Sequence, residues 1–127
     1  MDRTLMTLDY LDFDYSGEAD GSGSFDAMAS VAPQQLAAVH AEIATVLAWA
    51  HDAFADRRGA PEDGGEWDFD LQSQQEFSVP ETMRFDEATG VLTVQPGAPG
   101  APRHTVSLSI GGSPGFCDAL RAQFEIS

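Results

Sequence analysis

The stretch of residues 33–58 limits the fold more than any other part of the chain. It contains no glycine, its only proline is Pro33 at the start, and alanine is abundant. Positions spaced by three and four residues form the apolar stripe of an amphipathic helix. These positions are Leu36, His40, Ile43, Leu47, Ala50 and Phe54. We expect the helix to end at Arg57-Arg58-Gly59, because positive charge in the last turn and a following glycine both favour a helix C-terminus.

The segments on either side of this helix alternate as β-strands do. In residues 4–15 two period-2 patterns meet out of phase, which predicts a strand with a bulge near residues 9–11. A second strand over 25–31 is expected to return beside it after the polar turn 16–24, making a hairpin. Further strands are predicted over 67–77 and 106–110, with a hairpin over 83–94 whose turn ends in a glycine.

A short closing helix completes the order β-β-α-β-β-β-β-α. Ser113 and Pro114 suit the N-cap and the first helical position, and Phe116, Leu120 and Phe124 then line one side. Hairpins combined with one long helix predict a single α+β domain over residues 1–127. Its architecture would be a two-layer sandwich: an antiparallel sheet of β-hairpins, with the long amphipathic helix and the short C-terminal helix on one face. The other face of the sheet would meet water.

The charge balance limits the partners of the chain. It holds 21 acidic residues against six arginines and no lysine, for a formal charge of −15 and an isoelectric point near 4.1. Such a field repels phosphate backbones and anionic lipid headgroups, so we expect no nucleic acid bound by direct phosphate contact and no membrane. Because 43% of the residues are hydrophobic, the acidity does not imply disorder.

Cysteine usage and the N-terminal sequence indicate the compartment. Cys117 is the single cysteine, so neither an intramolecular disulfide nor a multi-cysteine zinc site can form. No basic region followed by a long apolar run occurs at the N-terminus. We therefore expect a cytoplasmic protein, with Cys117 acting as a small buried hydrophobic residue in the closing helix.

Residues 12–20 are similar to the opening of an EF-hand calcium loop. Acidic side chains at Asp12, Asp14, Glu18 and Asp20 provide hard oxygen ligands of the kind that calcium prefers. A true EF-hand is excluded, because the twelfth position is Gly23 where a bidentate glutamate belongs. A calcium site of another kind, using these four carboxylates, is the alternative function. The competing interpretation is an acidic surface loop that closes a hairpin.

A surface for binding another protein is the leading interpretation. Asp12 and Asp14 are predicted on one face of the first strand, and Asp68 and Asp70 on the polar face of a later one. If both pairs face water on one sheet, four carboxylates cluster and require solvation, an offset in strand register, or neutralisation by a metal or a basic partner. Trp49 lies off the apolar stripe of the long helix, so either another element covers it or it anchors a partner.

That partner would be a basic protein or a second copy of the chain, as a homodimer. An enzyme is the third alternative, because paired carboxylates also perform acid–base catalysis in glycoside hydrolysis. No nucleophile elbow, phosphate loop or cofactor motif occurs, and the sequence predicts no catalytic residue. The sequence thus favours a small acidic interaction module without a cofactor, with calcium binding through residues 12–20 as the alternative.

Overall fold

The structure is a computed structural model that describes residues 8–126. The order β-β-α-β-β-β-β-α is confirmed, with a short 3-10 helix added after the long helix. The elements in chain order are β1 (Asp14–Gly17), β2 (Gly23–Val31), α1 (Pro33–Ala53), η1 (Pro61–Asp63), β3 (Trp67–Glu76), β4 (Glu81–Asp86), β5 (Val91–Pro96), β6 (Arg103–Gly112) and α2 (Pro114–Phe124).

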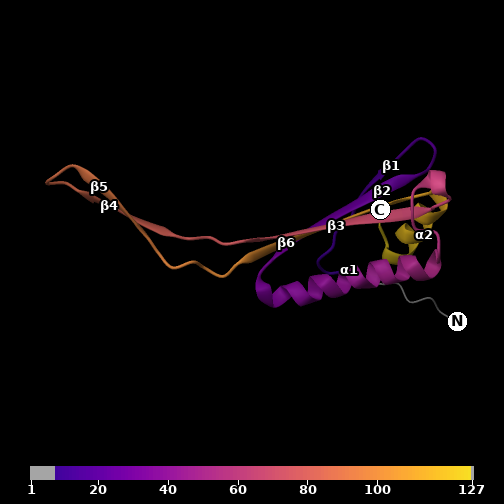
Figure 1. Cartoon of the computed structure of the whole chain (residues 1–127), viewed down its shortest axis with the longest axis horizontal. Helices are drawn as coiled ribbons and strands as arrows, with labels where there is room; N and C mark the ends of the chain where they lie inside the picture. The colour runs from indigo at the N-terminus through magenta and orange to yellow at the C-terminus, as the bar shows by residue number, and fades with distance from the viewer. Residues whose placement is uncertain (1–7, 127) are drawn as a thin grey trace.

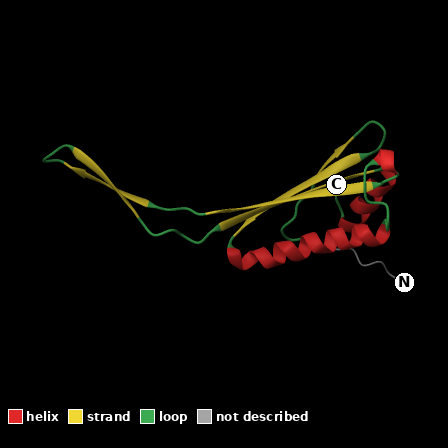
Figure 2. Cartoon of the chain, viewed as in Figure 1, coloured by secondary structure: helices red, strands yellow, loops and turns green. Residues whose placement is uncertain are grey.

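Four of the strands form an antiparallel sheet in the order β1-β2-β6-β3, and both helices pack on one of its faces (Figures 1 and 2). This confirms the predicted α+β sandwich. The register places Phe25 of β2 opposite Ile110 of β6, and Ile110 opposite Phe69 of β3. Because side chains alternate along a strand, this row faces the helices while the neighbouring rows face away. We call the four-stranded sheet with α1 and α2 the body.

The core lies between the sheet and the two helices. α1 buries Val39, Ile43, Val46 and Ala50 against the inward residues of β2 and β6. The predicted stripe of α1 is therefore only partly right. Ile43 and Ala50 are buried, but His40 is exposed and Leu36 and Leu47 are half-buried. The apolar arc of α1 is therefore wider than the surface that the sheet and α2 cover.

The N-terminal part differs from the predicted strand over 4–15. Residues 8–13 form no strand, β1 begins only at Asp14, and residues 4–7 lie outside the described residues. The backbone N–H groups of Asp9, Tyr10 and Leu11 donate instead to the carboxylate of Glu42 on α1, at 2.8–3.1 Å. The helix therefore satisfies donors that a strand ladder would otherwise pair.

The end of α1 also differs from the prediction. The helix stops at Ala53, and the chain turns back toward the start of β3. Arg57 pairs with Glu66 at 3.0 Å and Arg58 with Asp68 at 2.7 Å. The two arginines that were predicted to end the helix thus form ion pairs with Glu66, just before β3, and Asp68, near its start.

Helix α2 begins as predicted. The Ser113 hydroxyl accepts a hydrogen bond from the Phe116 backbone N–H at 3.3 Å, and Pro114 occupies the first turn. Cys117 is buried, as predicted, and burial raises the pKa of its thiol. In the described part of the chain, neither helix is long and apolar enough to cross a membrane.

Strands β4 and β5 form a separate two-stranded sheet that stands away from the body (Figure 1). The predicted turn is confirmed, and Gly90 supplies the positive φ of 71° that it requires. Pro80, Pro99 and Pro102 lie in the two linkers between this hairpin and the body. Proline has no N–H to donate, so the strand ladder is interrupted here. The two linkers remain joined by hydrogen bonds from the Gly97 N–H to the Pro80 carbonyl oxygen at 2.8 Å and from the Gly100 N–H to the Ser78 carbonyl oxygen at 2.9 Å. We call residues 81–96 the hairpin arm.

Candidate binding face

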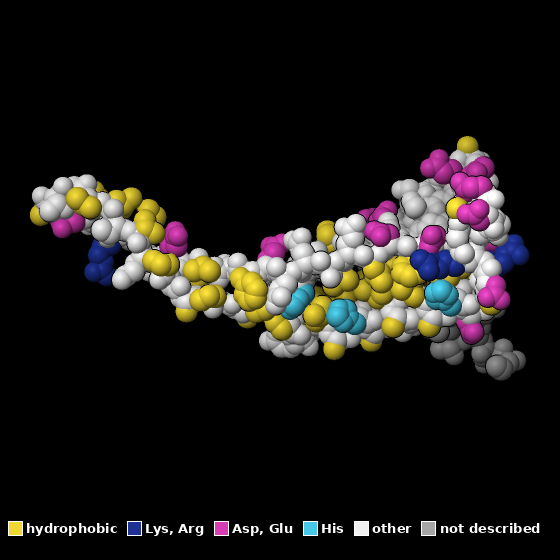
Figure 3. All heavy atoms as spheres, in the orientation of Figure 1, with side chains coloured by type: hydrophobic (Ala, Val, Ile, Leu, Met, Phe, Trp, Pro, Cys, Tyr) yellow, Lys and Arg dark blue, Asp and Glu magenta, His cyan; other side chains and the backbone are white. Residues whose placement is uncertain are grey.

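The face of the sheet that carries no helix presents a row of carboxylates. Asp14 of β1 lies opposite Asp26 of β2, Asp26 lies opposite Ser109 of β6, and Ser109 lies opposite Asp70 of β3. The row therefore crosses all four strands. Figure 3 shows acidic side chains gathered on the side of the sheet that faces away from α1. We call this surface the open face.

The carboxylates of this row have no cationic partner among residues 8–126. Ser109 donates its hydroxyl to Asp26, and the Gln72 side-chain amide donates to Asp70 at 3.1 Å. Within the described residues, the ion pairs formed by arginine involve only Glu66 and Asp68. Carboxylates placed opposite each other on paired strands repel, so the row has unneutralised negative potential.

Asp68 lies one row further along the open face and is already engaged. Its carboxylate accepts hydrogen bonds from the Phe69 backbone N–H at 2.8 Å and from Arg58 at 2.7 Å. The backbone N–H of Phe69 lowers the pKa of Asp68, and the hydrogen bond and charge of Arg58 lower it further. Asp70 is thus better placed than Asp68 to receive a cation from outside.

An exposed methionine lies beside the acidic row. Met28 follows Asp26 on the same face of β2 and is 67% exposed, more than any other large apolar side chain in the described part of the chain. Met28 lines a hollow of about 350 Å³ together with Asp14, Asp26 and Asp70. At this place a ligand could contact the flexible thioether of Met28 with an apolar group and the neighbouring carboxylates with a charged group.

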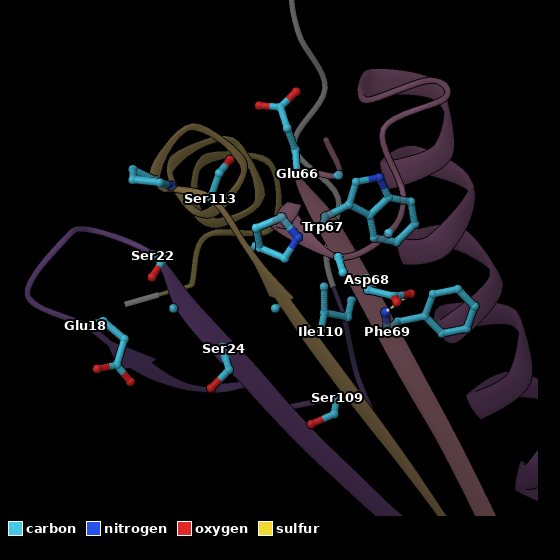
Figure 4. Close-up of a pocket in the computed structure, with 18 of the residues that line it drawn as sticks. Glu18, Ser22, Ser24, Glu66, Trp67, Asp68, Phe69, Ser109, Ile110 and Ser113 are labelled. Carbon is cyan, nitrogen blue, oxygen red and sulfur yellow. Dashed lines mark hydrogen bonds between the residues drawn. The ribbon is translucent and has the colours of Figure 1, made fainter. Parts of the chain in front are cut away.

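A larger hollow of about 720 Å³ lies at one end of the sheet, between the β1–β2 loop and the start of β3 (Figure 4). Its lining includes the carboxylate residues Glu18, Asp20, Glu66, Asp68 and Asp70 and several serines and glycines. A Cβ atom on Gly111 would meet only the Gly23 carbonyl oxygen, at 3.5 Å, so side chains leave this space open. We call it the acidic hollow.

The loop between β1 and β2 forms one wall of the acidic hollow. Asp20 accepts hydrogen bonds from the Ser22 hydroxyl at 2.6 Å and from the Ser22 backbone N–H at 3.0 Å. These bonds to Ser22 lower the pKa of Asp20, so its carboxylate stays ionised. The wall is therefore held in shape by its own side chains.

The structure brings together three of the residues predicted for partner binding. Asp14, Asp68 and Asp70 share the open face, whereas Asp12 lies before β1, so its predicted place on a common strand face with Asp14 is wrong. Sequence reasoning missed Asp26, whose polar position between Phe25 and Ala27 was visible. Its place between the other carboxylates depends on strand order, which the sequence does not show.

Trp49 is covered by part of the protein itself. It is half-buried, and its ring lies 6.2 Å from Phe54, 6.2 Å from Phe116 and 5.7 Å from Phe124, measured between centroids. Helix α2 supplies two of these rings. Of the two interpretations that the sequence left open, coverage by another element of the chain is the one observed.

The four carboxylates predicted for calcium do not converge. Asp14 belongs to the row on the open face, and the Asp20 carboxylate accepts a hydrogen bond from the Ser22 hydroxyl. Among residues 8–126, no group of three or more His, Cys, Asp or Glu side chains is placed to hold a metal ion. The geometry therefore gives no support to a metal site made of Asp12, Asp14, Glu18 and Asp20.

Comparison of the chain with protein-family models, curated proteins and solved structures finds no match.

Proposed function

We propose that the protein is an interaction module that binds a basic segment of another protein on the open face. The observation that carries the proposal is the row of Asp14, Asp26 and Asp70 across four strands, which no arginine of the described residues neutralises. A lysine or arginine side chain placed over the row would relieve the repulsion between these carboxylates.

The apolar contact beside the row suits the same kind of ligand. Lysine and arginine carry a charged head on a long apolar stem, and the stem buries well against apolar side chains. Met28 offers such a contact next to Asp26 and Asp70. The acidic hollow is large enough to receive a whole side chain from the same segment. The overall charge of −15 would speed the encounter with a basic partner.

A binding titration with an arginine- and serine-containing peptide tests the proposal. Fluorescence anisotropy would be measured for the unaltered protein and for the Asp26→Asn and Asp70→Asn variants. Asp52→Asn and Asp118→Asn serve as matched controls, because these residues are exposed on the helices and their change alters the net charge equally. We expect the open-face variants to raise Kd by about tenfold each and the controls to change it less than twofold. Equal losses in both sets would contradict the proposal.

A second pair of variants tests the acidic hollow. The Gly111→Leu change would place a side chain in the hollow, whereas Gly115→Leu adds the same side chain in the first turn of α2, where nothing lies within 4 Å of a Cβ atom. We expect only Gly111→Leu to weaken binding of the peptide, with circular dichroism confirming that both variants fold. Unchanged affinity in the Gly111→Leu variant would remove the hollow from the binding surface.

A further inference from the structure

The hairpin arm has one apolar and one polar face. Met83 pairs with Val94, and Phe85 pairs with Leu92. These two pairs are adjacent on the same side of the hairpin, and their four side chains are between 49% and 61% exposed. Side chains that share one face of a hairpin in this way form a continuous apolar surface. We call it the arm's apolar face.

The opposite face of the hairpin arm is polar. It carries the pairs Thr82 with Gln95 and Arg84 with Thr93, while Val91 lies opposite Asp86 near the turn. One wetted face and one apolar face are typical of a sheet that is covered on one side. An isolated two-stranded hairpin is only marginally stable in water, so covering the apolar face would stabilise the arm.

A groove of matching chemistry lies on the body between α1 and β3. Its lining includes Ile43 and Leu47 of α1, Leu71 of β3 and Val106 of β6, with His40 at one side. Figure 3 shows hydrophobic side chains exposed between the sheet and α1. Leu71 of β3 is 44% exposed there. The half-buried Leu47 belongs to the part of the apolar arc of α1 that the sheet and α2 do not cover fully. We call this the α1–β3 groove.

Most of the sheet edge beside this groove is unpaired in the described part of the chain. β3 is hydrogen-bonded to β6 on one side, and on its other side, among residues 8–126, only Trp67 at its start forms a bridge, to Arg58. β3 contains no proline or lysine that would protect an edge. A hairpin placed along such an edge can add its strands to the sheet.

We propose that the α1–β3 groove is covered by the hairpin arm of a second copy of this chain, so that two copies form a two-fold homodimer. The arm's apolar face would lie against Leu47 and Leu71 of the partner copy. The arm cannot serve its own groove, because it projects away from the body (Figure 1). A two-fold axis makes the contact reciprocal, since every copy carries one arm and one groove.

A second copy suits the groove because this chain itself carries an exposed apolar surface, on its arm, that matches the apolar lining of the groove. Two chains of charge −15 repel over most of their surfaces. The residues that line the α1–β3 groove include no carboxylate, and on the arm's apolar face the only neighbouring carboxylate within the described residues is Glu81, beyond Met83 at the end nearest the linker. Two copies can therefore meet there with little opposition between acidic side chains. This inference is independent of the proposed function, because the open face lies on the other side of the sheet.

Sedimentation over a range of protein concentrations tests the dimer with one matched pair of variants. Val94 and Val91 lie on the same strand and are 49% and 51% exposed, but they face opposite sides of the arm. We expect the unaltered chain to dimerise, Val94→Ser to raise the dimer Kd about tenfold, and Val91→Ser to change it less than twofold. A monomer at all concentrations, or equal effects of the two changes, would overturn the proposal.

A disulfide experiment tests which surfaces meet. The Phe85→Cys and Leu71→Cys variants are prepared separately, mixed and oxidised; the native Cys117 is buried. A disulfide joining the two different variants is expected, and it can only be intermolecular. If Phe85→Cys instead cross-links faster to itself than to Leu71→Cys, two arms contact each other and the groove assignment is wrong.

Discussion

The rings of Trp67 and Phe116 stack in parallel, with centroids 5.5 Å apart and an angle of 2° between their planes. The contact joins the first residue of β3 to the first turn of α2, and both side chains are fully buried. Trp49 and Phe54 of the α1 region also contact the Phe116 ring. Phe116 therefore connects the sheet with both helical regions.

Replacing Phe116 should be among the most destabilising changes in the chain. We expect Phe116→Ala to lower the free energy of unfolding by about 3–5 kcal/mol, because it removes a buried aromatic ring and leaves a cavity. Denaturant unfolding followed by tryptophan fluorescence measures the change. Phe77→Ala, at a linker residue that is 60% exposed, is the control and should cost less than about 0.5 kcal/mol.

Adjacent glycines at the end of β6 should respond differently to alanine. A Cβ atom on Gly112 would lie 2.4 Å from the Phe116 ring and 2.8 Å from the Glu66 carbonyl oxygen, whereas one on Gly111 meets nothing closer than 3.5 Å. We expect Gly112→Ala to destabilise the fold by about 1–3 kcal/mol through overpacking. Thermal unfolding should show little loss for Gly111→Ala. Equal melting temperatures for the two variants would contradict this packing.

The Glu42 carboxylate should be essential for anchoring the chain before β1. Glu42→Ala leaves the N–H groups of Asp9, Tyr10 and Leu11 without their acceptor, at a cost of about 1–3 kcal/mol. Hydrogen exchange should then accelerate at these amides. Glu62→Ala, at an exposed carboxylate in η1, is the comparison and should leave their exchange unchanged.

The Cys117 thiol should be protected at neutral pH and should weaken the fold in alkali. Burial raises its pKa in the folded state, so the folded chain holds the thiol proton more tightly than the unfolded chain. The resulting stabilisation is complete below the ordinary thiol pKa of 9.0 and decreases as pH rises above it. A disulfide reagent at pH 8 should react far more slowly with the native protein than with the unfolded chain; equal rates would mean that the thiol is accessible.

Calcium should leave the melting temperature unchanged. A native-state site would raise it by mass action, but the carboxylates of residues 12–20 do not converge on a common point. Scanning calorimetry with and without millimolar calcium measures this. A calcium-dependent rise would restore the metal-site alternative.

Local patterns predicted the elements where one physical signal dominated. Gly90 ended a short turn between alternating segments, and Ser113 and Pro114 marked the start of α2; both predictions are confirmed. The end of α1 was predicted wrongly because Arg57 and Arg58 satisfied the helix-end rule. In the structure they pair with Glu66 and Asp68, which are distant enough in sequence that no local rule includes them.

The sequence by itself determined the α+β class, the order of the elements and the excess of negative charge, because alternation, helical periodicity and composition are local properties. Only the tertiary structure decided that Asp26 stands between Asp14 and Asp70, that α2 covers Trp49, and that the 81–96 hairpin leaves the main sheet. Each of these depends on strand order, register or packing between distant segments, and such relationships are set by the whole fold.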